Sequence, residues 1–231
     1  MSVRSPNPVI ASPRVLDLLD HLHGLSTFQE AQITSESYRQ KDGFDDLMRD
    51  KFIALDQDKC WFVYQLLLSN RSRYVVEAGT SFGVSTIYLS LAVSQNLKSL
   101  GLDASQGKII ATENEATKAI RAKEWWNQAG KDVEELIDLR QGDLRETLKT
   151  HLPEKIDLLL LDIWCPLALP TLQLVQPNLH SGSVVIIDNI VGSADRYKDL
   201  IEYLRDGKND FRNLTIPYNK GLGMSVYMGK R

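Results

Sequence analysis

The chain has 231 residues, a net charge of −3 and an isoelectric point near 5.8. Hydrophobic residues make up 43% and charged residues 25%, as in ordinary globular proteins, so we expect one α/β domain with a modest N-terminal extension. The slightly acidic balance offers no surface for a nucleic acid. The longest apolar runs fall well short of about 18 residues, so no membrane partner is expected.

The two cysteines, Cys60 and Cys165, have no partner at metal-site spacing and do not make a disulfide framework. Residues 1–6 lack the apolar run of a signal peptide. Together these features predict a protein of the reducing cytoplasm.

The N-terminal quarter differs in composition from the rest of the chain. Residues 1–13 are rich in Ser and Pro and predict a loose arm, and the leucine spacing over 15–23 predicts a short helix. Residues 35–51 are polar and could form a lid or a linker. We therefore divide the chain into an arm and helical lid over 1–51 and a main domain over 52–231.

In the main domain, a helix over 57–68 is followed by short apolar runs that alternate with longer amphipathic segments. Strands are expected over 74–77, 108–112, 136–140, 156–161, 183–187, 211–216 and 223–228. Helices are expected over 85–93, 116–129, 145–150, 167–175 and 197–205.

This alternation predicts right-handed crossovers and a doubly wound, mostly parallel, seven-stranded sheet. The unbroken apolar runs over 157–161 and 184–187 are typical of strands buried on both faces. Only a turn separates the last two strands, which predicts an antiparallel C-terminal edge strand.

A glycine loop follows the first strand, where ligands bind in open α/β sheets. Gly79 and Gly83 would let the backbone approach a ligand, and the next helix presents free N–H groups. The Gly-x-x-x-Gly spacing is not that of a dinucleotide site, and the carboxylate of Glu77 would repel pyrophosphate. It suits an amino group or a sulfonium. A plain strand–helix turn is the alternative.

Acidic residues also follow the second and third strands. Glu113 can accept two hydrogen bonds from a ribose diol, or it can serve as a helix-capping residue. Asp143, after Gly142, can meet an adenine amino group or cap the next helix.

Oxygen-bearing side chains end the fourth and fifth strands. Asp162, Asp188 and Asn189 converge if these strands are adjacent and parallel, and such a set suits a hard divalent ion such as Mg²⁺. Alternatively, Asp162 contacts a cofactor while Asp188 and Asn189 form a turn.

Taken together, residues 52–229 resemble the catechol O-methyltransferase family of class I, Rossmann-like methyltransferases. The segment over 75–85 resembles its cofactor motif, Glu113 its ribose acid, the segments over 161–164 and 187–189 its metal motifs, and 221–227 its closing strand. The resemblance implies that S-adenosylmethionine is the cofactor. Its expected binding residues are Glu77, Gly79, Ser81, Gly83, Ser85, Glu113, Gly142, Asp143 and Asp162.

The resemblance also implies methyl transfer to a hydroxyl of a small molecule, assisted by Mg²⁺ or another divalent cation. Asp162, Asp188 and Asn189 are then both metal ligands and catalytic residues, and a homodimer is suggested by the fold class alone.

Two positions depart from the family pattern. Cys165 stands where the family has a base lysine, and Gly223 stands where it has a glutamate that orients the substrate. These departures disfavour a standard catechol substrate and favour a metal-independent or nitrogen-directed methyltransferase as the main alternative. A catalytically degenerate cofactor-binding subunit is a second alternative. A nicotinamide oxidoreductase is a third, against which the missing third glycine and Glu77 argue.

Overall fold

The computed structural model describes residues 6–33 and 51–229. The helices are α1 (Pro13–Glu30), α3 (Gln57–Ser69), α4 (Val84–Leu100), α5 (Ala116–Ala129), α6 (Lys131–Glu134), α7 (Leu144–Thr147), α8 (Cys165–Val175) and α9 (Lys198–Arg205). The strands are β1 (Tyr74–Ala78), β2 (Lys108–Glu113), β3 (Ile137–Gln141), β4 (Ile156–Leu161), β5 (Leu179–Asp188), β6 (Phe211–Ile216) and β7 (Leu222–Tyr227).

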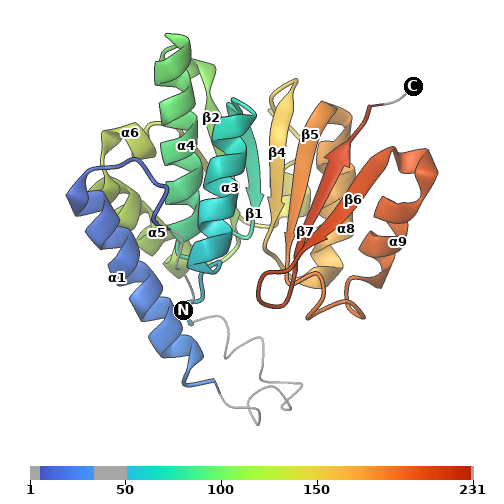
Figure 1. The fold of residues 1–231 in the computed structure, drawn as a ribbon, viewed down its shortest axis with the longest axis horizontal. Helices are drawn as coiled ribbons and strands as arrows, with labels where there is room; N and C mark the ends of the chain where they lie inside the picture. The colour runs from blue at the N-terminus through green and yellow to red at the C-terminus, as the bar shows by residue number, and fades with distance from the viewer. Residues whose placement is uncertain (1–5, 34–50, 230–231) are drawn as a thin grey trace.

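The strands form one sheet in the order β3-β2-β1-β4-β5-β7-β6 (Figure 1). Pairing is parallel from β3 to β5, while β7 runs antiparallel to both β5 and β6. The predicted mostly parallel, seven-stranded sheet is confirmed. The antiparallel strand β7 lies one position inside the edge, and β6 forms the edge itself.

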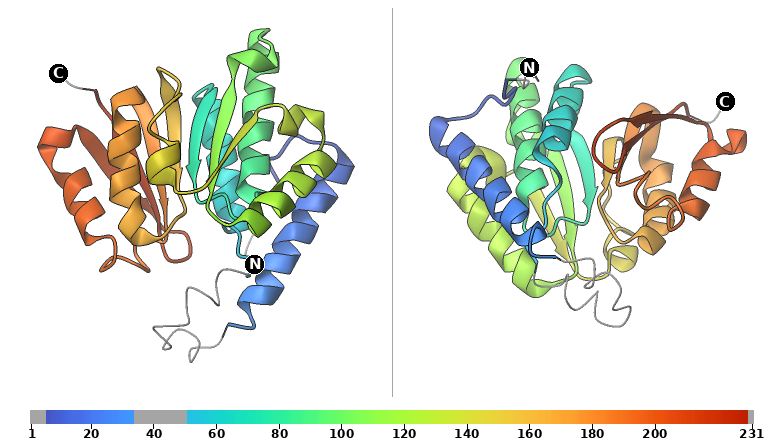
Figure 2. Two further views of the ribbon diagram at one scale, coloured as in Figure 1. Left: turned by 180° about the vertical axis from the view of Figure 1, so that it is seen from behind. Right: turned by 60° about the horizontal axis from the view of Figure 1, so that its bottom comes forward.

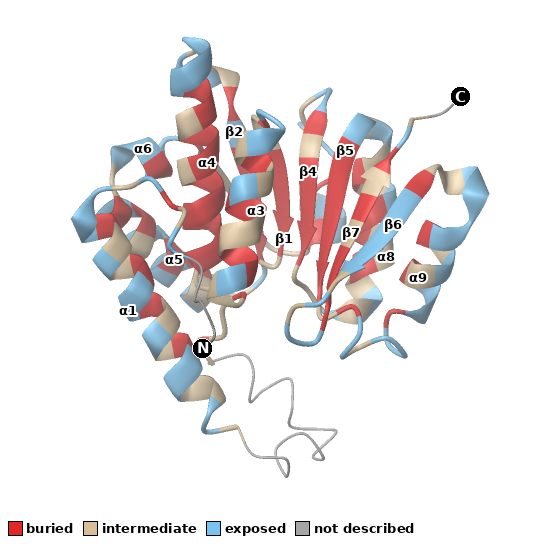
Figure 3. Cartoon of the chain, viewed as in Figure 1, coloured by how far each residue is buried: buried red, intermediate tan, exposed pale blue. Residues whose placement is uncertain are grey.

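Helices cover both faces of the sheet because successive strand side chains point to opposite sides. Val75 packs in a core with residues of α1, α3, α4 and α5, whereas Val76 packs in a second core with residues of α7, α8 and α9. The central strands β1, β4 and β5 are buried over most of their length, and β6 is exposed (Figure 3). Burial on both faces explains their unbroken apolar runs.

The N-terminal segment is more firmly packed than its composition predicts. Helix α1 spans 18 residues and lies along α5 in the views of Figure 2. Before it, Val9 is buried, and the backbone N–H of Ile10 donates to the Tyr64 hydroxyl at 3.1 Å. Residues 6–12 form no helix or strand, and Val9 fixes this part of the expected arm to the core. Residues 1–5 and 34–50, which include most of the expected lid or linker, lie outside the described part.

The main differences in element bounds have local causes. Helix α4 continues to Leu100, seven residues beyond the expected end, and stops at Gly101, which takes the left-handed conformation with φ of 67°. Strand β5 begins at Leu179 because the Ser183 hydroxyl ties the polar start to the backbone of Ile156 and His180. Among the described residues, no helix combines the length and apolarity needed to span a bilayer.

Candidate active site

A pocket of about 600 Å³ lies at the carboxyl edge of the parallel strands. The strand register places the ends of β1, β2, β3 and β4 side by side at this edge. The pocket wall includes Lys51, Gly79, Ser81, Glu113, Asn114, Lys118, Gly142, Asp143, Arg145, Asp162, Trp164, Cys165, Asn189, Ser193, Arg196 and Tyr197. Six of the nine expected cofactor residues therefore line one cavity: Gly79, Ser81, Glu113, Gly142, Asp143 and Asp162.

The glycine loop is shaped by two close approaches. A Cβ on Gly79, whose φ is 92°, would lie 2.0 Å from the carbonyl oxygen of Asp162. A Cβ on Gly83, whose φ is 76°, would lie 2.4 Å from the Trp126 indole nitrogen, which donates to the Gly83 carbonyl at 2.9 Å. The absence of a side chain at Gly79 allows the end of β1 to approach the end of β4 below the pocket. The absence of one at Gly83 allows α4 to pack against α5, and Gly83 does not line the cavity.

Glu77 lies inside the protein, beneath the loop. It is fully buried, and its carboxylate accepts hydrogen bonds from the hydroxyls of Thr80 (2.8 Å), Ser85 (2.6 Å) and Thr86 (2.6 Å). Burial raises the pKa of Glu77, while these three hydroxyls oppose the rise. Neither Glu77 nor Ser85 is on the pocket wall, where contact with a cofactor was expected; both support the loop from below, and their contact with the cofactor stays a prediction.

Glu113 links the second strand to the same loop. Its carboxylate accepts the backbone N–H of Ser81 at 2.7 Å and that of Glu115 at 2.8 Å. Burial raises the pKa of Glu113, and the backbone donors work against this effect. Because Glu113 also lines the pocket, lone pairs on its oxygens remain available to a diol.

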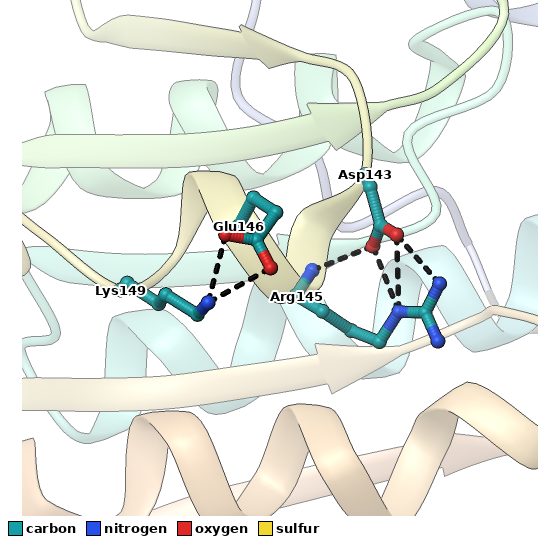
Figure 4. A network of polar contacts seen from close by, with 4 residues as sticks. All are labelled: Asp143, Arg145, Glu146 and Lys149. Atoms are coloured by element: carbon teal, nitrogen blue, oxygen red, sulfur yellow. Dashed lines mark hydrogen bonds and ion pairs between the residues drawn. The ribbon is translucent and has the colours of Figure 1, made fainter.

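Asp143 both lines the pocket and caps α7. Its carboxylate accepts the backbone N–H of Arg145 at 2.9 Å and pairs with the Arg145 guanidinium at 2.6 Å (Figure 4). The side-chain hydrogen bonds from Arg145 lower the pKa of Asp143. Asp143 therefore caps the next helix, one of the two roles expected for it; contact with an adenine amino group stays a prediction.

The end of β5 holds an ion pair that the sequence did not reveal. The ammonium of Lys59 in α3 lies 2.6 Å from Asp188 Oδ1 and 2.9 Å from Asp56 Oδ2, although the Lys59 side chain is only 1% exposed. The second Asp188 oxygen accepts a hydrogen bond from the Asn189 amide. Burial disfavours the charged form of Lys59, but its two carboxylate partners outweigh this and raise the pKa.

The three predicted metal ligands therefore do not form an open metal site. Asp162 and Asn189 line the pocket, whereas Asp188 lies below its wall. Both carboxylate oxygens of Asp188 accept hydrogen bonds, one from Lys59 and the other from Asn189. No group of three or more carboxylate, imidazole or thiolate ligands is placed to hold an ion within residues 6–33 and 51–229. The residues present do not fit a divalent cation.

The far end of the pocket has an aromatic and cationic character. Trp164 carries the Arg196 guanidinium 5.2 Å above its ring, and Tyr197 and Cys165 lie on the same wall. Burial raises the pKa of Tyr197, and Cys165 and Asp162 raise it further. Trp164 ends one of the predicted motifs and Cys165 was singled out beside it, whereas Arg196 and Tyr197 lie between β5 and α9, where the sequence showed no motif.

Gly223 shows why no orienting acid stands in the last strand. A Cβ at this position would lie 3.2 Å from Cδ1 of Ile187 and 3.4 Å from Cβ of Ile190. The buried strand β7 thus leaves little room there for a larger side chain.

The pocket does fit a nucleoside ligand that carries an amino-acid chain. Glu113 and Asp143 supply acceptors at the ends of β2 and β3, and Gly79 opens the backbone at the end of β1. These residues would hold the ribose, the adenine side and the amino-acid part of S-adenosylmethionine, respectively.

Residues 76–190 match the family model described as a methyltransferase domain. None of the curated proteins matches the chain.

Solved structures share the fold at low sequence identity. The O-methyltransferase TomG from Streptomyces achromogenes, in complex with SAM, is 17% identical, with 91% of this chain and 99% of that chain covered and a TM-score of 0.66. SAH-bound methyltransferase PaMTH1 from Podospora anserina is 12% identical, with 94% and 89% covered and a TM-score of 0.66. The O-methyltransferase from Bacillus cereus in complex with SAH is 17% identical, with 89% and 99% covered and a TM-score of 0.62.

The matched residues run from β1 to just after β5 and so include the strands whose carboxyl ends line the pocket. The chain therefore carries a methyltransferase domain over residues 76–190, within the Rossmann-like fold of the S-adenosylmethionine-dependent methyltransferases.

Proposed function

We propose that the chain methylates an acidic hydroxyl, such as that of a phenol or an enol, on a small molecule. The observation that carries this proposal is the continuity of one pocket from Glu113 and Asp143 to Asp162, Trp164 and Tyr197. Cofactor and acceptor can therefore meet inside a single cavity, which supplies the proximity and alignment that methyl transfer needs. Bound S-adenosylmethionine supplies an electrophilic methyl group on a sulfonium.

The acceptor end supports an aromatic hydroxyl. Trp164 and Tyr197 offer ring surface, Arg196 offers positive charge toward a developing phenolate, and Asp162 offers an acceptor for the hydroxyl hydrogen. A phenol ionises near pH 10, far more readily than an aliphatic alcohol. It therefore needs a weaker base to remove its proton, which suits a site where Cys165 stands at the base position.

Titration calorimetry and a radiolabelled transfer assay test this proposal. We expect S-adenosylhomocysteine to bind, NADH not to bind, and labelled methyl to reach phenols but not matched aliphatic alcohols. Binding without transfer to any phenol, alcohol or amine would support a cofactor-binding subunit instead. Transfer to amines alone would support a nitrogen-directed enzyme.

Trp164→Ala and Glu113→Gln separate the two halves of the pocket. Trp164→Ala should raise the KM for the phenol about tenfold, a change equivalent to about 1.4 kcal/mol, and leave S-adenosylhomocysteine affinity unchanged. Glu113→Gln should weaken S-adenosylhomocysteine, because the amide group cannot replace every acceptor of the carboxylate. The reverse pattern would contradict this assignment of the two ends.

A further inference from the structure

Lys59 is a buried cation on a helix face that is otherwise packed into the core. Its neighbours in α3, Cys60, Val63, Tyr64 and Leu67, are buried as well. An ammonium in such a place is strongly disfavoured unless carboxylates pair with it. The short contacts to Asp188 and Asp56 meet this need, so the position of the charge is fixed from both sides.

Asp188 is saturated by donors from within the chain. One oxygen binds the Lys59 ammonium and the other binds the Asn189 amide. A divalent ion on Asp188 would have to displace one of these donors. Since the ammonium and the ion would share one carboxylate, they would also lie within a few ångströms of each other and repel.

We propose that the Lys59 ammonium is the resident cation of this site and takes the place of a divalent metal. This inference rests on the proposed hydroxyl methylation and specifies how that site is built. Lys59 acts as a positioning residue: it holds Asp188, and Asp188 in turn holds the amide of Asn189, whose residue lines the pocket. The acceptor hydroxyl then binds without metal chelation.

The carboxylates around Lys59 explain why its removal should open a metal site. Asp56 and Asp188 both contact the ammonium, and the Asn189 amide contacts the second oxygen of Asp188. Lys59→Ser would leave these two carboxylates and the Asn189 amide beside the space vacated by the lysine chain. Such an oxygen set without a cation suits Mg²⁺ or Mn²⁺.

Manganese binding tests the inference directly, by electron paramagnetic resonance of the full chain with S-adenosylhomocysteine. The wild type should show no saturable Mn²⁺ binding. Lys59→Ser should bind one equivalent of Mn²⁺ at least about tenfold more tightly than any residual binding by the wild type. Adding Asp188→Asn to Lys59→Ser should remove that site. Lys59→Arg should behave like the wild type. Lys98→Ser is the matched control, because Lys98 forms an exposed pair with Asp132.

Saturable Mn²⁺ binding by the wild type that Asp188→Asn removes would overturn the inference, and so would a folded Lys59→Ser that gains no site. If Lys59→Ser does not fold, the wild-type titration and methyl transfer after dialysis against EDTA still decide. We expect that transfer to be unchanged, and loss restored by Mg²⁺ would overturn the inference. The Mn²⁺ titrations need no turnover, so they remain valid even if no acceptor is methylated.

Discussion

At the scale of single residues, two well-paired carboxylates, Glu77 and Asp188, are absent from the pocket wall and lie behind it. Glu77 is held by three hydroxyls, and Lys59 and Asp188 hold each other at the end of β5. The groups that face the cavity, such as Glu113 and Asp143, are themselves tied to backbone N–H groups. The site is therefore preorganised by buried polar contacts, each of which is costly to break.

Gly79→Ala should abolish cofactor binding. The new Cβ would lie 2.0 Å from the Asp162 carbonyl oxygen, and the φ of 92° is strained for any other residue, so the loop and the end of β4 must separate. Calorimetry with S-adenosylhomocysteine measures the loss. Gly24→Ala is the control, since a Cβ there meets nothing within 4 Å and its helical position favours alanine. Retained tight binding by Gly79→Ala would contradict the placement of the loop.

Glu77→Gln should lower the free energy of unfolding by about 1–3 kcal/mol, because an amide nitrogen cannot accept the hydroxyl hydrogens that the carboxylate accepts. Cofactor affinity should fall with it, since the loop loses its support. Urea titration gives the stability change. Glu146→Gln, at an exposed pair with Lys149, should change neither quantity, and equal effects of the two substitutions would refute the buried role (Figure 4).

At the scale of elements, the sequence patterns predicted the strands best, because burial on both faces leaves a continuous apolar signal. The run over 156–161 matches β4 in full, and 211–216 matches β6. Helix ends were less predictable. Helix α4 continues through Leu97 and Leu100 to the left-handed Gly101, beyond its expected end, and α1 continues to Glu30.

The site was predictable where a residue follows a strand directly. Glu113, Asp143 and Asp162 were found in this way and line the pocket. The direction in which Glu77 points could not be read from the sequence, because three hydroxyls of the folded loop decide it. Lys59 could not be paired with Asp188 either, since 129 residues separate them and only the packing of α3 on the sheet brings them together.

Leu22→Ala tests whether α1 is part of the main fold. Leu22 is fully buried in the core shared by α1, α3, α4 and α5, so the substitution should reduce the free energy of unfolding by about 2–5 kcal/mol. Phe28→Ala on the same helix should have little effect, because Phe28 is 65% exposed. A single cooperative transition that Leu22→Ala leaves unshifted would mean that α1 is only an appendage.

At the scale of the whole molecule, one sheet separates two hydrophobic cores. The pocket lies at the carboxyl edge of this sheet, where residues of both faces end. Residues of α4 pack with β1 on one face and residues of α8 pack with β4 on the other, so both layers fix the carboxyl edge. A partly buried titratable pair joins α1 to α4 beside the first core: His23 Nε2 lies 3.0 Å from the hydroxyl of the buried Tyr88. Global stability should respond to the protonation of His23.

Burial lowers the pKa of His23 from 6.5 to about 4, and Asp20 and Asp56 oppose this shift only in part. Between these two values the unfolded chain binds a proton that the folded chain does not, so stability rises with pH. The stabilisation is present above pH 6.5 and is lost as pH falls toward 4. From pH 7 to pH 5, the free energy of unfolding of the wild type should fall by about 2 kcal/mol more than that of His23→Gln. Glutamine keeps a polar partner for Tyr88 but does not titrate. Urea titrations at both pH values measure this difference, with His21→Gln, at an exposed position of the same helix, as the control. An equal loss in wild type and His23→Gln would show that His23 is protonated in the folded protein at pH 5.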